Sequence, residues 1–207
     1  MPLSDELAAG GKWGRATILL AAGASVRLGQ PKQLLQVEGK SLLRRAAEAA
    51  VASGAAPVIV VLGSDAHRLT PELSGLPVFS VLNGAWQEGM GSSLRCGVEA
   101  VQLQAPSTSA VLFMVCDQPR ITAAHLQALW NRYAASGRVI AVQHAGRPGV
   151  PAIFPAKYLP ELGKIAGDQG ARSLLSSLPD TDIELVGLPE AALDVDTPAD
   201  LARLAAR

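Results

Sequence analysis

The fold class is indicated by one stretch, Thr17-Ile18-Leu19-Leu20-Ala21-Ala22-Gly23-Ala24-Ser25-Val26-Arg27-Leu28-Gly29, followed by Gln30-Pro31-Lys32. It opens with a short apolar run that stops at a glycine, which is typical of a strand buried on both faces of a parallel sheet. The small residues that follow let successive backbone N–H groups approach a phosphate, and Arg27 and Lys32 add positive charge. We predict a triphosphate cradle here, with an ordinary strand-to-helix turn and two exposed cations as an equal alternative.

Strands and helices alternate along the rest of the chain. Strands are expected at Val58–Leu62, Val78–Leu82, Val111–Val115, Val139–Gln143, Ala152–Phe154 and Ile183–Val186. Helices are expected over Leu42–Val51 with Ser41 as its cap, Ala66–Leu73, Ser93–Leu103, Thr122–Ser136 and Ala171–Ser177, and others begin at Pro155 and Pro198. This alternation predicts an α/β fold with a Rossmann-like, doubly wound, mostly parallel sheet flanked by helices.

Two segments depart from this pattern. Residues 1–15 show no period and are expected to form a flexible N-terminal leader before a single domain over residues 16–207. Residues 145–151 hold too many Gly and Pro residues for a regular element, so we expect a hairpin-like insertion over the sheet.

The composition excludes several classes of protein. Hydrophobic residues make up 49% of the 207 residues and charged residues 17%, which excludes disorder driven by charge. The 18 basic and 18 acidic residues leave no net charge, so no global field attracts nucleic acid or an anionic membrane surface. With two cysteines, no membrane-spanning run and no signal peptide, the chain is expected to be cytoplasmic and to lack a disulfide scaffold.

A carboxylate directly follows the strand expected at Val111–Val115, in the sequence Val115-Cys116-Asp117-Gln118-Pro119. Ligands bind at the carboxyl ends of strands in open parallel sheets. A carboxylate there suits Mg²⁺, whose other ligands are water and phosphate oxygens. Asp117 is therefore a candidate metal ligand, and a turn-forming aspartate is the alternative.

Two further carboxylates lie near the end of the chain, in Leu193-Asp194-Val195-Asp196-Thr197-Pro198. Thr197 and Pro198 fit the start of a helix, with Thr197 as its cap. Asp194 and Asp196 would share one face of an extended segment, so either could supply a second metal ligand. Simple solvent exposure is the alternative for both.

Two glycine-rich segments open expected helices. Gly89-Met90-Gly91-Ser92-Ser93-Leu94 starts like a dinucleotide fingerprint but has a leucine in place of the third glycine, so a nicotinamide cofactor is not expected. Gly167-Asp168-Gln169-Gly170-Ala171-Arg172 offers N–H donors and a guanidinium. Either segment can hold an anion, although each alone is also explained as a helix start.

Together these motifs resemble the MobA-like nucleotidyltransferases, and within them most closely the molybdenum cofactor cytidylyltransferases. The resemblance runs from about residue 17 to residue 204. Its motifs are Leu20-Ala21-Ala22-Gly23-x-Ser25-x-Arg27-x-Gly29-x-x-Lys32, Gly89-Met90-Gly91-x-Ser93-Leu94, Cys116-Asp117-Gln118-Pro119, Gly167-Asp168-x-Gly170-Ala171-Arg172 and Asp194-x-Asp196-Thr197-Pro198. It implies a fold like that of the nucleotide-diphospho-sugar transferases and Mg²⁺-dependent nucleotidyl transfer with release of pyrophosphate.

The resemblance also implies roles for individual residues. It assigns catalysis to Arg27, Lys32 and Asp117, and metal binding to Asp117 and Asp196. It assigns nucleotide binding to Leu20, Ala21, Ala22, Gly23, Arg27, Lys32, Asn83, Gly91, Ser92 and Ser93, and acceptor binding to Pro148, Pro151, Asp168, Gly170 and Arg172.

The reaction that the resemblance implies transfers CMP from CTP to a phosphorylated acceptor, molybdopterin or its molybdenum form, with Mg²⁺ or Mn²⁺ as cofactor and a molybdoenzyme as partner. CTP is favoured over GTP because guanylyltransferases of this family carry Leu-Ala-Gly-Gly where this chain has Leu20-Ala21-Ala22-Gly23. Two alternatives stay open. One is transfer to a sugar or alditol phosphate, and the other is a non-catalytic protein that binds the nucleotide or cofactor for molybdoenzyme maturation.

Overall fold

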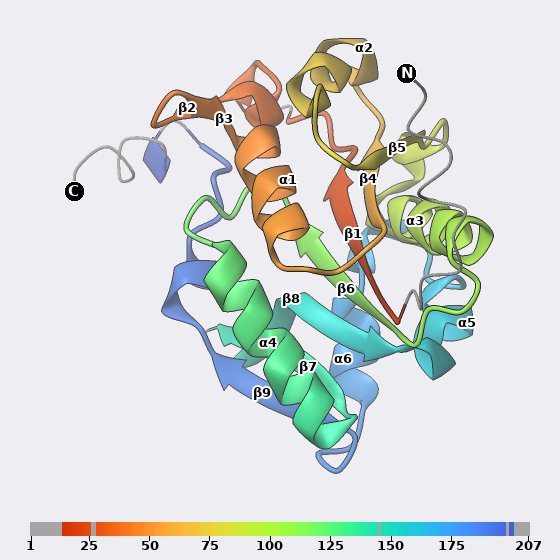
Figure 1. The fold of residues 1–207 in the computed structure, drawn as a ribbon. Helices are drawn as coiled ribbons and strands as arrows, with labels where there is room; N and C mark the ends of the chain where they lie inside the picture. The colour runs from red at the N-terminus through yellow and green to blue at the C-terminus, as the bar shows by residue number, and fades with distance from the viewer. Residues whose placement is uncertain (1–13, 26–27, 145, 198, 201–207) are drawn as a thin grey trace.

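The computed structural model describes residues 14–25, 28–144, 146–197 and 199–200. Its main sheet has seven strands in the order β5-β4-β1-β6-β8-β7-β9 (Figure 1). The strands are β1 (Arg15–Ala21), β4 (Val58–Leu62), β5 (Phe79–Leu82), β6 (Ala110–Val115), β7 (Val139–His144), β8 (Arg147–Pro155) and β9 (Ile183–Gly187). Within this sheet β8 runs antiparallel to β6 and β7, and the other neighbouring strands are parallel. The predicted mostly parallel α/β sheet is therefore confirmed.

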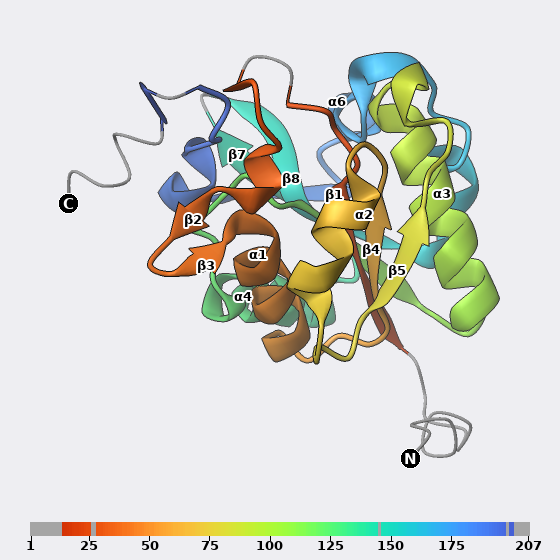
Figure 2. The same cartoon turned by 90° about the horizontal axis from the view of Figure 1, so that it is seen from above.

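Helices cover both faces of the sheet (Figure 2). They are α1 (Leu42–Ala52), α2 (Ala66–Leu69), α3 (Met90–Gln104), α4 (Ala123–Ser136), α5 (Leu159–Leu162) and α6 (Arg172–Ser177), and a small ribbon of β2 (Gln36–Val37) and β3 (Lys40–Ser41) precedes α1. Residues of α1 and α4 share one hydrophobic cluster with the sheet, and residues of α3, α5 and α6 share the other. As expected, Ser41 caps α1, because its Oγ accepts a hydrogen bond from the Arg44 N–H at 3.1 Å.

The central strand β1 shows why an uninterrupted apolar run forms a strand here. Leu19 and Ala21 pack into the cluster beneath α1 and α4, whereas Ile18 and Leu20 pack into the cluster beneath α3. Successive side chains of a strand point to opposite faces, so a strand covered on both faces needs apolar residues at nearly every position.

The order of the strands places a crevice beside the end of β1. From β1 the chain moves to β4 and then to β5 on one side, and later returns to β6 on the other side of β1. Loops that leave neighbouring strands in opposite directions open a crevice at the carboxyl ends of those strands. The turn after β1 and the residues after β6 therefore lie together at one edge of the sheet.

The hairpin expected around residues 145–151 is present, but the interpretation of this segment as irregular and as an insertion over the sheet is wrong from Arg147 onward. These residues begin β8, a strand within the sheet that forms a hairpin with β7. Only Ala152 to Pro155 of β8 pair with β6, so the earlier part of β8 has a partner on one side only. A register shift after Ala141 of β7 further relaxes the pairing. Prolines are tolerated at such edges and bulges, which explains why this sequence is compatible with a strand.

Smaller differences concern the ends of elements. β1 begins at Arg15, which pairs with Ala110 of β6 and therefore does not belong to the expected leader. Residues 1–13 of that leader lie outside the described residues. The helix expected from Pro155 is split into a short turn, η5 (Ala156–Tyr158), and α5. The last helix, expected from Pro198, falls mostly outside the described residues.

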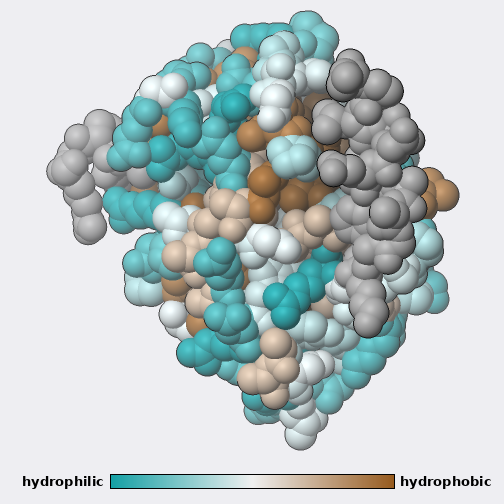
Figure 3. Space-filling view, in the orientation of Figure 1, coloured by the Kyte–Doolittle hydropathy of each residue, from teal (hydrophilic) through white to brown (hydrophobic). Residues whose placement is uncertain are grey.

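The described surface is mainly polar. Figure 3 shows hydrophilic residues over much of this face, with apolar groups among them. The large hydrophobic side chains that are exposed are Leu82, Met90, Leu103 and Leu185. In the described part of the chain, no helix combines the length and the hydropathy that crossing a membrane requires.

Candidate active site

Two adjoining cavities open along the carboxyl edge of the sheet. The first, which we call the β1 cavity, has a volume of about 460 Å³ and a wall that includes Ala22 and Gly23. The second, which we call the β8 cavity, has a volume of about 730 Å³ and a wall that includes Arg172 of α6. The two cavities share the side chains of Lys32, Met90, Val115, Asp117 and Asp168, and among these Lys32 and Asp117 form an ion pair.

Lys32 joins two carboxylates that are distant in the sequence. Its ammonium donates hydrogen bonds to Asp117 Oδ2 and, at 2.8 Å, to Asp196 Oδ1. Lys32 begins a short turn, η2 (Lys32–Leu34), and its backbone N–H donates to Ser25 Oγ at 3.0 Å. Burial alone would lower the pKa of Lys32, but the two carboxylates outweigh burial and hold that pKa above its ordinary value. The ammonium therefore stays charged at physiological pH.

The carboxylates around Lys32 fit a divalent cation. Asp117 Oδ1 is buried and has no hydrogen-bond partner among the described residues, so one oxygen is left for a ligand of another kind. Asp194 and Asp196 line the β8 cavity together with Asp117. The described residues do not form a metal cluster of three or more acidic, His or Cys side chains. Asp117 and Asp196 fit Mg²⁺ or Mn²⁺ as a cation that completes its coordination with water and phosphate oxygens.

The turn after β1 is held by Gln33, a residue that the motifs did not single out. Its side chain is 1% exposed, and its Nε2 donates to the carbonyls of Ala21 at 3.0 Å and Gly23 at 2.7 Å. Its Oε1 accepts a hydrogen bond from Ser25 Oγ at 3.3 Å. These bonds fix the backbone that lines the β1 cavity. Arg27, which was expected to bind phosphate from this turn, lies outside the described residues.

Ala22 lies where three segments pack closely. A Cβ added at Gly63, just after β4, would lie 2.7 Å from the Ala22 carbonyl oxygen and 2.8 Å from Ala22 Cβ. It would also lie 2.7 Å from the Cβ of Trp86, the first residue of a short turn, η4 (Trp86–Glu88). The glycine therefore lets Trp86 approach Ala22, and both side chains contribute to the wall of the β1 cavity, as do Leu20 and Ala21.

Asn83, Ser92 and Ser93, which were expected to bind the nucleotide, form a buried polar cluster at the start of α3. Asn83 Nδ2 donates to Ser92 Oγ at 2.8 Å and to Ser93 Oγ at 3.1 Å. Ser93 lines the β1 cavity, whereas Asn83 and Ser92 are not part of its wall. At Gly91, an added Cβ would lie 2.6 Å from the Ile165 carbonyl oxygen, so this glycine lets α3 pack against that segment. Asn83, Gly91 and Ser92 thus support the wall from behind.

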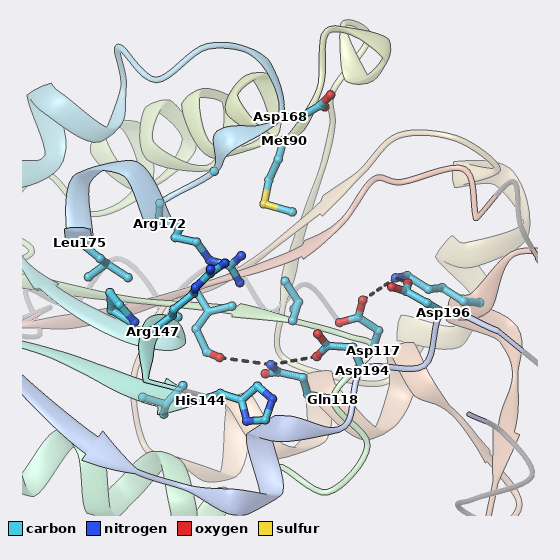
Figure 4. Close-up of a pocket in the computed structure, with 18 residues that line it drawn as sticks. Met90, Asp117, Gln118, His144, Arg147, Asp168, Arg172, Leu175, Asp194 and Asp196 are labelled. Atoms are coloured by element: carbon cyan, nitrogen blue, oxygen red, sulfur yellow. Dashed lines mark hydrogen bonds and ion pairs between the residues drawn. The ribbon is translucent and has the colours of Figure 1, made fainter. Parts of the chain in front are cut away.

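The residues expected to bind the acceptor gather mainly around the β8 cavity. Its wall includes Pro148, Asp168, Gly170 and Arg172. Pro151 is buried within β8 and is not part of the wall. His144 and Arg147 also line the cavity, from the hairpin of β7 and β8 (Figure 4).

Gln118 is a second glutamine whose role was missed. It is 8% exposed, and its Nε2 donates to the Val150 carbonyl at 3.1 Å, the Ala191 carbonyl at 3.2 Å and Asp194 Oδ1 at 3.2 Å (Figure 4). Burial and the nearby Asp117 raise the pKa of Asp194, while the bond from Gln118 favours its charged form. Gln118 therefore ties the end of β6 to β8 and to the segment that carries Asp194.

The arrangement can hold two charged substrates side by side without a protein nucleophile. Burial raises the pKa of the Cys116 thiol to about 12, so Cys116 is not a thiolate at neutral pH. The polar groups at the junction are instead an ammonium and carboxylates, which suit the binding of phosphates and a cation.

Comparison with known sequences identifies a family and its relatives. The family model for the MobA-like NTP transferase domain matches residues 17–182. Nicotine blue oxidoreductase of Paenarthrobacter nicotinovorans is 31% identical over 198 residues, which cover 90% of this chain and 94% of that protein. A probable molybdenum cofactor guanylyltransferase of Rhodopirellula baltica is 27% identical over 190 residues, which cover 89% of this chain and 88% of that protein.

Solved structures show the same fold. The crystal structure of Rv0371c from Mycobacterium tuberculosis H37Rv has a TM-score of 0.79 and 28% identity, and the match covers 94% of this chain and 98% of that one. The complex of Rv0371c with manganese has a TM-score of 0.73 and 26% identity, with 92% and 97% covered. The similarity therefore extends over nearly the whole of both chains.

Proposed function

The chain belongs to the MobA-like NTP transferase family, and we propose that it transfers CMP from CTP to a phosphorylated acceptor, with release of pyrophosphate. The proposed acceptor is molybdopterin or its molybdenum form. The observation that carries the proposal is the junction of two cavities at Lys32 and Asp117, because transfer requires a nucleotide and an acceptor to meet at one point.

In the proposed reaction, an oxygen of the acceptor phosphate attacks the α-phosphorus of CTP, and the bond from that phosphorus to pyrophosphate breaks. Lys32 offsets the negative charge that grows on the pyrophosphate, aided by Arg27. Asp117 and Asp196 would hold Mg²⁺ or Mn²⁺, which when bound supplies further positive charge to the phosphates. The acceptor phosphate is itself ionised near neutral pH, so the reaction needs no nucleophile from the protein.

The choice of CTP rests on Ala22, whose methyl group stands where guanylyltransferases of the family have a glycine hydrogen. Its contact with the segment of Gly63 and Trp86 supports this proposal, because a bulkier residue at position 22 brings the wall of the β1 cavity inward. One methyl-sized contact gives a preference of about 10- to 200-fold in kcat/KM. We further propose a cytoplasmic location and a molybdoenzyme that receives the product.

The test is release of pyrophosphate from each of the four NTPs, with and without molybdopterin, in Mg²⁺ or Mn²⁺. We expect release that depends on molybdopterin and is fastest with CTP. Release that is as fast with GTP contradicts the cytidylyltransferase assignment. Release with sugar or alditol phosphates but not with molybdopterin contradicts the acceptor, and nucleotide binding without any release indicates an accessory protein.

One relative is named nicotine blue oxidoreductase, so a parallel assay tests this chain for oxidation of a nicotinamide cofactor. Oxidation of NADH or NADPH by a quinonoid dye as electron acceptor, followed by absorbance, is expected to stay at the background rate, because the segment from Gly89 has Leu94 where a dinucleotide site needs a third glycine. Oxidation well above that rate would contradict a purely transferase function.

A further inference from the structure

The wall of the β8 cavity is divided by charge. Asp117, Asp194 and Asp196 lie with Lys32 at the end where the β1 cavity adjoins. Arg147 and Arg172 reach into the cavity from the opposite side, and their guanidinium groups extend toward its middle (Figure 4). A ligand that fills the cavity would meet carboxylates and an ammonium at one end and guanidinium groups at the other.

Arg147 and Arg172 have no carboxylate partner in the described part of the chain. Ion pairs with Asp or Glu are formed by Arg44, Arg45, Arg68, Arg95, Arg132 and Arg138. Among the described arginines, Arg15, which lies over the Trp130 ring, and Arg120 also form no such pair, but neither of them lines this cavity. Asp168, which also belongs to the wall of the cavity, points away from Arg147 and Arg172 (Figure 4). The donors of both guanidinium groups are therefore available to a ligand.

Separate elements position these two guanidinium groups. Arg147 is the first residue of β8 and pairs with His144 across the hairpin. Arg172 is the first residue of α6, which packs against β8. A guanidinium offers a planar fork of donors that matches a carboxylate or phosphate with two hydrogen bonds. Like charges that face one cavity repel each other, and an anion between them relieves that repulsion.

Apolar side chains also line the cavity. They include Met90, Val115, Val142, Val150 and Leu175. A cavity of about 730 Å³ with such a lining is larger than a phosphate group requires and suits a ligand with a ring or chain as its body.

We infer that the acceptor carries two anionic groups, the phosphate that reacts and a second anion that Arg147 and Arg172 bind. The inference rests on the proposed function, because transfer requires the reacting phosphate to lie beside Lys32 and Asp117, where the cavities meet. The anion at the arginines is then a different group of the same molecule. The β8 cavity thus selects elongated acceptors with an anion at each end over simple phosphate monoesters.

The test uses matched pairs of probes, an ω-phosphonoalkanoate and the alkylphosphonate of the same length, over chains from hexyl to decyl. Binding to the full chain is measured by titration calorimetry in Mg²⁺ without nucleotide. For at least one chain length, we expect the ω-phosphonoalkanoate to bind about 10-fold or more tightly than the alkylphosphonate that lacks the carboxylate. Arg147→Gln and Arg172→Gln should each remove most of this difference. Arg132→Gln, which alters an exposed arginine paired with Glu184, is the matched control and should retain it.

Two outcomes overturn the inference. One is equal affinity of the two probes at every chain length. The other is an equal loss of affinity for both probes in the arginine variants, because the arginines would then bind the phosphonate itself. Circular dichroism establishes that the variants are folded. The binding assay contains no nucleotide, so it is independent of the transfer reaction. If the protein binds the carboxylate probe more tightly than the alkylphosphonate but releases no pyrophosphate from any NTP, the proposed function is overturned and the two-anion site remains.

Discussion

The two halves of the sheet build their cavities in different ways. On the side of β1, β4 and β5 the strands are parallel, and small residues of the β1 turn, such as Ala22 and Gly23, belong to the wall of the β1 cavity. On the side of β8, β7 and β9 the sheet is mixed and has a bulge, and the β8 cavity is walled by long side chains such as Arg147 and Arg172. Backbone at a strand end is fixed by the fold, whereas long side chains can be exchanged without changing it. Under the proposed function, we expect the first half to bind the nucleotide and the second half to determine which acceptor is bound.

The junction, where the two cavities meet at Lys32 and Asp117, is built from residues of both halves of the sheet. Asp117 comes from the end of β6, whereas Asp196 comes from the segment after β9, and Lys32 from the β1 turn joins them. Variants at the junction should impair the reaction as a whole, whereas variants in one half should alter one substrate.

The largest effect is expected for Asp117→Asn at the junction. The amide keeps the size of the side chain but loses the charge that pairs with Lys32 and would hold a cation. We expect kcat/KM for pyrophosphate release to fall by about 100-fold or more, with an unchanged circular dichroism spectrum. Asp180→Asn, at an exposed position, is the control. A folded Asp117→Asn protein that retains activity within a few-fold of the parent would show that Asp117 is only a turn residue.

Lys32→Ala alters the same junction, but it should change NTP binding and Mn²⁺ binding in opposite directions. Loss of a cation that touches the phosphates should weaken NTP binding by about 10-fold and lower kcat by a similar factor. Binding of Mn²⁺ alone, measured by electron paramagnetic resonance, should instead become tighter, because Asp117 and Asp196 lose a competing positive charge. Unchanged NTP affinity would remove Lys32 from the phosphate site.

Gln118→Met should loosen the connection between the halves. The change keeps the length of the side chain but removes the bonds to Val150, Ala191 and Asp194. Residues that orient metal ligands typically contribute about 10- to 100-fold, and we expect losses in kcat and in Mn²⁺ affinity within that range. Gln127→Met removes a comparable amide bond, to the Ala52 carbonyl, far from the site and should have neither effect. If both variants behave alike, Gln118 has only a structural role.

The smallest effect should be confined to the first half. Ala22→Gly removes a methyl group from the wall of the β1 cavity and should narrow the preference for CTP over GTP by about 10-fold, within the range expected for one methyl-sized contact. The measurement is kcat/KM for both nucleotides with one acceptor and one metal concentration. If Ala22→Gly changes the preference among acceptors instead, the claim that the β1 cavity affects only the choice of nucleotide is contradicted.

The sequence was most informative where local pattern determines structure. The apolar run of β1 could be predicted because a strand buried on both faces needs consecutive apolar residues. The carboxylate after β6 could be predicted because it directly follows such a run in the sequence. Gln33 and Gln118 could not be assigned roles, because they hydrogen-bond mainly to backbone carbonyls, which leave no pattern, and Gln118 reaches carbonyls in distant segments. The strand from Arg147 was missed because its prolines are tolerated only through pairing with β7 beyond the end of β6.

The ion pair between Lys32 and Asp196 spans 164 positions of the chain. The last strand, β9, ends at Gly187, so a ribosome has produced every strand of the sheet before it produces Asp196. The residues that form the sheet thus precede the last carboxylate of the junction in the chain. Cleavage between β9 and Asp194 would leave all seven strands unbroken but would cut the backbone that positions Asp194 and Asp196 near Lys32, so we expect such a cut to affect the junction before the sheet.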